Sequence, residues 1–124
     1  MKWKKESVGI AHEDDRRALS AMFNGGFVGK QVKIIKIKKA GVILGNHYHH
    51  YKEMFYLLKG CAKYTLKDIE TQKTEELLME EGDRLTIEPK VAHKAFFLKD
   101  TIMIEATEKK YVSAEENDVR YEEW

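Results

Sequence analysis

The chain has 124 residues, of which 43% are hydrophobic and 35% are charged. This length fits one compact domain, and this composition is typical of a folded globule rather than a disordered chain. Lysine and arginine number 22 against 21 aspartates and glutamates, a formal net charge of +1, which argues against a nucleic-acid-binding or membrane-surface protein. A single cysteine excludes an intrachain disulfide and a multi-cysteine metal site.

The amino-terminal residues lack the apolar core of a signal peptide, and no apolar run approaches the ~18 residues of a membrane span. A cytoplasmic protein is therefore expected. Its charged residues are mostly lysine and glutamate, and glutamine is confined to Gln31 and Gln72. This bias is seen in heat-adapted proteins.

In chain order, residues 13–22 come first and fit either a short helix or an edge strand. From Phe27 onward, short β-like runs alternate with turn residues, and the acidic tail after Tyr111 is expected to pack over the outside or to fray. Because eight short strands with tight turns lack crossover helices, the pattern predicts an all-β fold, an antiparallel sandwich or barrel. The predicted strands are residues 27–38, 42–49, 53–59, 61–67, 75–80, 84–88, 92–98 and 101–107.

The first predicted strand carries lysines that interleave with β-branched residues, and these are expected to form the solvated face of a strand. Strand 53–59 instead alternates two apolar rows, one with Phe55 and Leu57 and one with Tyr56 and Leu58. Only one row can line a barrel, so the other, which also holds Met54, needs cover from a second sheet or another subunit. A homodimer held through the outer faces of its strands is therefore expected.

A cluster of metal-ligand residue types lies near the middle of the chain. His47 and His49 are two residues apart, so on a strand both imidazoles project from the same face. A three-residue turn then brings Glu53 onto the next strand, close enough for its carboxylate to meet them. Two neutral nitrogens and one carboxylate that converge form a site for a divalent transition metal, and His93 on a later strand is a fourth candidate.

This segment resembles a known protein family. The spacing Gly41-x5-His47-x-His49-x3-Glu53-x6-Gly60 is similar, position for position, to the first motif of the cupin superfamily.

The second cupin motif, Gly-x5-Pro-x-Gly-x2-His-x3-Asn, is matched in part. Gly82, Pro89 and His93 are present with the glycine-to-histidine distance preserved. Pro89 comes one place late, Val91 occupies the usual glycine region, and Phe97 stands where asparagine is common. The resemblance covers about residues 30–107.

The resemblance implies one cupin domain over residues 1–124, an antiparallel double-stranded β-helix (an RmlC-like jelly-roll barrel) with its core at about 27–107. A short or irregular amino-terminal segment and a carboxyl-terminal tail would flank this core. The resemblance also implies that His47, His49, Glu53 and His93 are metal ligands. Such a donor set favours Mn, Fe, Ni, Co or Zn over Ca or Mg, which prefer oxygen ligands.

Two finer resemblances concern function. Residues 46–50 (NHYHH), followed by Glu53, look like the cupin domain of bifunctional capsule sugar-nucleotide epimerase/reductases. Residues 15–19 (DRRAL) resemble small cupins that isomerise keto-sugar nucleotides, a group that usually lacks the metal-binding glutamate. In this comparison, the charged Asp15, Arg16 and Arg17, together with Lys30, are candidate partners for a phosphate or sugar.

Three functions fit these residues. In a sugar or sugar-nucleotide isomerase or epimerase, His47, His49 or a metal-activated water would take a proton next to a carbonyl. An Fe- or Mn-dependent dioxygenase would use the same ligands, and a non-catalytic protein would bind a small molecule in the barrel. The resemblances favour the first, whereas His50, His12, Tyr48, Tyr51 and Cys61 are expected to be surface or packing residues.

Overall fold

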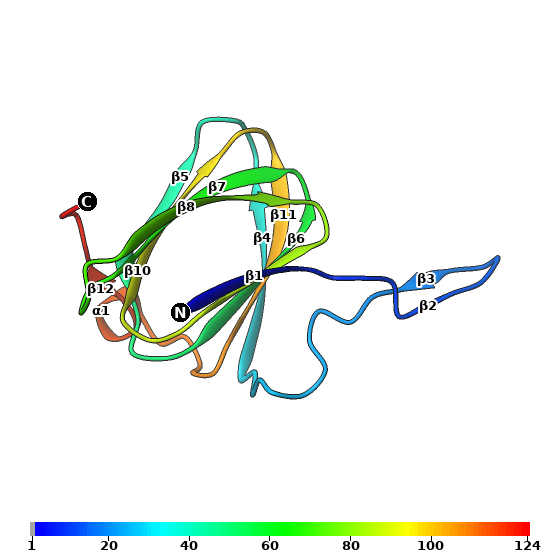
Figure 1. Cartoon of the computed structure of the whole chain (residues 1–124), viewed down its shortest axis with the longest axis horizontal. Helices are drawn as coiled ribbons and strands as arrows, with labels where there is room; N and C mark the ends of the chain where they lie inside the picture. Colours follow the sequence, from blue (N-terminus) through cyan, green and yellow to red (C-terminus); the bar gives the residue numbers. More distant parts are fainter. Residues whose placement is uncertain (1) are drawn as a thin grey trace.

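A computed structural model of the chain describes residues 2–124. Two five-stranded antiparallel sheets face each other and enclose the core (Figure 1). The eight predicted strands are all present, each within one residue of its expected ends except the first, which begins at Gln31 rather than residue 27. They are β4 (Gln31–Ile37), β5 (Ile43–Tyr48), β6 (Glu53–Lys59), β7 (Cys61–Asp68), β8 (Thr74–Glu80), β9 (Asp83–Ile87), β10 (Val91–Phe97) and β11 (Thr101–Thr107).

The ends of the chain add a strand to each sheet. β1 (Trp3–Ser7) pairs with β9, and β12 (Val119–Arg120) pairs with β5. The first sheet therefore has the order β1-β9-β6-β11-β4 and the second β12-β5-β10-β7-β8. Most successive strands of the barrel lie in opposite sheets, as in a jelly roll. The expected short amino-terminal segment thus includes β1, which Trp3, buried in the core, holds on the sheet.

Residues 13–22 are not helical. β2 (His12–Glu13) and β3 (Ala18–Leu19) form a hairpin that projects away from the barrel (Figure 1). The side chain of Asp14 accepts hydrogen bonds from the backbone N–H groups of Arg16 and Arg17, at 2.9 and 3.1 Å. An aspartate that bonds the backbone two and three residues on stabilises a turn, which decides between the two predicted structures.

The core follows the period-two alternation of the strands. The row of β6 with Phe55 and Leu57 faces inward, and Phe97 and Met103 meet it from β10 and β11. On β4 the expected solvated lysine face is wrong for Lys33, which lines a cavity inside the barrel. Because successive residues of a strand face opposite ways, Lys33 and Lys36, three residues apart, lie on opposite faces of β4. The fully buried large side chains are Tyr64, Phe97, Leu57, Leu66, Met79, Leu85 and Ile87.

The outward row of β6 is covered only in part by the chain itself. Met54 is buried in a small cluster with Phe27, against which Met22 and Phe23 pack. Met54 is thus covered by a loop of its own chain, rather than by a second sheet or another subunit as expected, whereas Leu58 stays exposed.

Gly60, which closes the cupin-like motif, joins β6 to β7 with a φ of +112°. A Cβ atom there would lie 2.7 Å from the backbone oxygen of Asp100, closer than real Cβ atoms approach other heavy atoms. Glycine is thus required both for the left-handed backbone and for the close packing against the β10–β11 turn. Apart from α1 (Ala114–Asn117), the described chain is strands, turns and loops, and no helix of residues 2–124 is long and apolar enough to cross a membrane.

Candidate functional site

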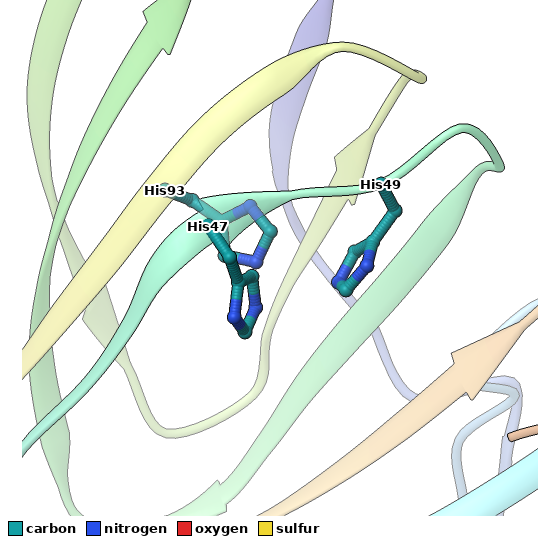
Figure 2. A group of neighbouring side chains, drawn as sticks. All are labelled: His47, His49 and His93. Carbon is teal, nitrogen blue, oxygen red and sulfur yellow. The ribbon is translucent and has the colours of Figure 1, made fainter. Parts of the chain in front are cut away.

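Three histidines meet inside the barrel. β5 pairs with β10 so that His47 and His93 are opposite one another, and His49 follows directly after the end of β5. All three side chains lie on the same side of these strands (Figure 2). One ring nitrogen from each lies within 4.8 Å of the others. The predicted convergence of the three imidazoles is therefore present.

Glu53 reaches the same place from the opposite sheet, at the start of β6. Its Oε1 lies 3.0 Å from Nε2 of His93, and its Oε2 lies 3.5 Å from Nε2 of His49. Glu53 is 1% exposed, so its carboxyl group is removed from water. Glu53 is therefore in contact with His49 and His93, while the group whose ligand atoms all lie within 4.8 Å of one another consists of the three histidines.

Hydrogen bonds to carbonyl groups fix the orientation of two of these rings. Nδ1 of His49 lies 2.7 Å from the backbone oxygen of Asn117, and Nδ1 of His93 lies 3.1 Å from that of Val91. A carbonyl oxygen only accepts, so both Nδ1 atoms donate a proton. In the neutral rings each Nε2 then carries a lone pair that faces Glu53.

At the centre of the cluster, the lone pairs of the two Nε2 atoms therefore face the carboxyl oxygens of Glu53, so hydrogen-bond acceptors lie opposite acceptors. Neither carboxyl oxygen of Glu53 has a hydrogen-bond partner of good geometry among residues 2–124, although two imidazole nitrogens are within ion-pair distance. Buried polar atoms without partners are rare and call for an explanation. A proton or a cation between these groups would satisfy both, and nitrogen and carboxylate donors suit a divalent transition metal.

The pKa values of the cluster favour its uncharged form. Burial raises the pKa of Glu53 well above its ordinary value, and the charge of Glu105 raises it further. Burial lowers the pKa of His93 well below its ordinary value, with His47 and His49 acting in the same direction. The pKa values of His47 and His49 are also lowered, mainly by burial. Neutral imidazoles are the form that binds metal ions.

A cavity of about 240 Å³ adjoins the cluster. His47 and His93 contribute to its wall, which also contains two charged side chains, Lys33 and Glu105. Nζ of Lys33 lies 3.3 Å from Oε1 of Glu105. The remaining wall is formed mainly by apolar residues, Ile35, Leu44, Phe55, Tyr64, Ala95 and Met103.

Glu105, Asn117 and Asp118 were not predicted from the sequence as site residues. Glu105 is buried and shares one face of β11 with Met103 and Thr107; its position in this row becomes a signal once the row is known to face inward. Asn117 and Asp118 lie 68 or more residues from the histidines of β5 in sequence, and no spacing pattern connects them.

Other candidate residues are placed outside the cavity. Arg16 and Arg17 lie in the exposed turn of the projecting hairpin, and Lys30 is exposed before β4; none of the three lines the cavity. His50 is exposed, as predicted. Tyr51 packs as predicted, stacked on His49 with ring centroids 4.7 Å apart, and burial raises its pKa to about 12.

A larger hollow of about 570 Å³ lies on the outer side of the first sheet, beneath the loop that holds Phe23 and Phe27. Several of its charged side chains form ion pairs with each other, such as Arg84 with Glu6 at 2.7 Å, and its one buried polar atom without a partner among the described residues is Nε of Arg84, a donor. The histidine cavity is instead bordered by two of the three clustered imidazoles, and the unpartnered carboxyl oxygens of Glu53 lie beside them, so we consider it the candidate functional site.

Solved structures with the same fold are similar over almost the whole chain. A 3,4-ketoisomerase from Helicobacter canadensis has a TM-score of 0.81 and 17% identity, and the match covers 97% of this chain and 91% of that one. The sugar 3,4-ketoisomerase QdtA from Thermoanaerobacterium thermosaccharolyticum, solved in complex with TDP, has a TM-score of 0.80 and 18% identity, with 96% and 88% covered.

A third similar structure is ChmJ, a 3'-monoepimerase from Streptomyces bikiniensis in complex with dTDP-quinovose. Its TM-score is 0.78 and its identity 16%, with 90% of this chain and 66% of that chain covered. These neighbours confirm the RmlC-like, cupin-type jelly roll. By sequence, no curated protein matches the chain significantly. A family model, however, matches residues 12–110, and on this match the chain belongs to the polysaccharide biosynthesis C-terminal domain family.

Proposed function

We propose that the protein is a sugar-nucleotide isomerase or epimerase that moves a proton next to a carbonyl group, with His47 as the residue that takes the proton. The family and the ketoisomerase and epimerase neighbours support this reaction class. One observation carries the proposal: the imidazole of His47, with a lowered pKa, lies on the wall of a cavity, beside two further buried imidazoles and a carboxyl group.

The exposure of the four side chains suggests a division of roles. The His47 side chain is 24% exposed and borders the cavity, whereas His49 and Glu53 are 6% and 1% exposed and lie behind it. His49, His93 and Glu53 would hold a divalent transition metal, which when bound supplies a positive charge that polarises a carbonyl oxygen. His47, whose pKa is lowered by burial, is neutral at pH 7 and is able to accept a proton.

The size of the cavity limits what enters it. Sites for whole drug-sized ligands have volumes of about 300–1,000 Å³, and this cavity has about 240 Å³. It therefore accommodates a monosaccharide ring, while the nucleoside diphosphate would lie outside its mouth. Lys33 and Glu105 offer the ring hydroxyls a donor and an acceptor on an otherwise mainly apolar wall.

Solvent deuterium exchange tests this proposal directly. The protein is incubated in D₂O with TDP- and UDP-linked 4-keto-6-deoxyhexoses, and NMR measures deuterium next to the keto group. We expect incorporation with the unmodified protein and a loss of about 10²–10⁴-fold for His47→Gln, the usual contribution of a general base. His50→Gln is the matched control, because His50 is exposed on the same segment. Binding of these sugars without any exchange would instead indicate a non-catalytic binding protein.

We further propose that two copies of the chain pair through the outer face of the first sheet. On β4, Val32 and Ile34 are 61% and 68% exposed. Ile34 is opposite Ile104 on β11, which in turn is opposite Tyr56 on β6, so these side chains form one apolar surface across three neighbouring strands. Contiguous apolar surfaces of this kind mark interfaces, and a standard interface buries about 800 Å² per partner.

Light scattering coupled to size-exclusion chromatography tests this pairing. The unmodified protein is expected at a dimer mass at micromolar concentration, and Ile34→Glu at a monomer mass. Lys73→Glu, an exposed change just before β8 in the second sheet, controls for the added charge. A monomer mass for the unmodified protein would refute the proposal.

A further inference from the structure

We propose that the carboxyl-terminal segment 114–121 is part of the site, and that Asn117 and Asp118 are positioning residues for His49 and His47. The inference rests on the proposed use of these histidines. Both residues lie outside residues 12–110, which the family model matches, so the family resemblance assigns them no role.

The segment is joined to the histidine strand by backbone pairing. β12 places Arg120 opposite His47 on β5. Beyond it, the backbone N–H of Tyr121 donates to the backbone oxygen of Asn46 at 2.8 Å, and the indole N–H of Trp124 donates to the Asn46 side chain at 2.9 Å. The tail therefore extends the second sheet along β5, the strand that carries His47 and ends just before His49.

Asn117 fixes the loop whose carbonyl group meets His49. Its side chain is buried and accepts hydrogen bonds from the backbone N–H groups of Val112 and Ser113, at 2.9 and 3.2 Å. Its amide nitrogen donates to the Tyr51 hydroxyl at 3.3 Å, and Tyr51 itself stacks on His49. With its side chain held on both sides, Asn117 presents its backbone oxygen 2.7 Å from Nδ1 of His49.

Asp118 faces the same two histidines. One of its carboxyl oxygens lies 3.5 Å from Nδ1 of His47, and the other lies 3.4 Å from Nδ1 of His49. A carboxylate beside Nδ1 favours the tautomer that carries its proton there, and so leaves Nε2 with a free lone pair. Among residues 2–124, Asp118 is the acidic residue that has a carboxyl oxygen within 4 Å of a ring nitrogen of His47. We therefore infer that Asp118 determines which ring nitrogen of neutral His47 carries the proton.

The test uses the metal-free protein labelled with ¹⁵N at histidine, at about pH 7.5, where neutral imidazole predominates. Long-range ¹H–¹⁵N correlation NMR reports which ring nitrogen carries the proton. We expect His47 and His49 of the unmodified protein to be Nδ1–H tautomers. Asp118→Asn is expected to give His47 a measurable population of the Nε2–H tautomer, and Glu116→Gln, an exposed change on α1, to leave it unchanged.

An Nε2–H tautomer for His49 in the unmodified protein would overturn the role of Asn117 without any variant. An unchanged His47 tautomer in folded Asp118→Asn would overturn the role of Asp118. If Asp118→Asn fails to fold, the unmodified protein decides the question: an Nε2–H tautomer for its His47 would also overturn the role of Asp118.

Cobalt titration gives a second readout. We expect Asp118→Asn to weaken Co²⁺ binding about 10–100-fold, as residues that orient metal ligands do. If the unmodified protein binds no Co²⁺, the proposed metal role fails, while the tautomers still decide this inference.

Discussion

Replacement of Glu53 by glutamine is expected to stabilise the metal-free protein while it abolishes the proposed metal binding. Glu53 is almost fully buried, its two oxygens have no hydrogen-bond partner of good geometry in the described chain, and burial raises its pKa well above the ordinary value. A glutamine has nearly the same shape, carries no charge, and is able to donate an N–H to Nε2 of His93. The variant thus keeps the packing and removes the cost of burying a carboxyl group that is ionised at neutral pH in the unfolded chain.

The size of the effect follows from the missing partners. A buried polar group without a hydrogen bond costs about 1–3 kcal/mol, and more when charged. For a domain of this size, 1 kcal/mol changes the melting temperature by about 4 °C, so Glu53→Gln should raise it by about 4–12 °C at neutral pH.

The pH dependence gives the sign of the effect independently. Because the pKa of Glu53 is raised in the folded protein, the folded state holds more protons, and its stability falls as pH rises from about 4.5 through that raised pKa. The imidazoles, with lowered pKa values, cost stability only as pH falls below about 6.5. Above pH 6.5 the difference between the two proteins therefore reports on Glu53.

Urea unfolding followed by circular dichroism, at several pH values and in the presence of a chelator, measures this difference. Glu81→Gln, an exposed change in a turn, is the control and should follow the unmodified protein. A saturating transition metal should stabilise the unmodified protein by about 2.7 kcal/mol at 100 times its dissociation constant, and should leave Glu53→Gln unchanged. A metal-free Glu53→Gln that is less stable than the unmodified protein at pH 7–8 would refute the reasoning.

Three other predictions concern a metal ligand, the pH dependence of metal binding and the glycine between β6 and β7. His49→Ala should lose most of the bound metal while the fold survives, because the core is formed by other residues; metal analysis beside circular dichroism checks this, and unchanged metal content would contradict it. Metal affinity should fall as pH falls from about 7 to about 5, as protons return first to Glu53 and then to the imidazoles; titrations that are flat over this range would point to a different site. Gly60→Ala should destabilise the fold by about 2–6 kcal/mol, from left-handed backbone strain and overpacking. Gly41→Ala, at a φ of +91° with nothing within 4 Å of its Cβ, isolates the strain, so equal losses in the two variants would exclude the contribution of packing.

Local patterns in the sequence were sufficient for the strands and for the cluster of ligand-type residues. Period-two alternation and turn residues located all eight barrel strands, because a strand's two faces and its ends are properties of a few neighbouring residues. The pairing of His47 with His49 followed from the same alternation. Glu53 was placed beside them by the three-residue turn that separates the two strands, and the cupin-like spacing supported His93 as the fourth candidate.

Contacts between distant segments could be decided only by the tertiary structure. The sequence showed two apolar rows on β6 but gave no reason for Phe27 to cover Met54, since that contact depends on where a loop crosses the sheet. Likewise, Lys33 and Glu105 became site residues only when β4 paired with β11. Asn117 and Asp118 reached the histidines because the tail pairs with β5. Such pairings depend on the free energy of packing the whole chain, which no short window of sequence contains.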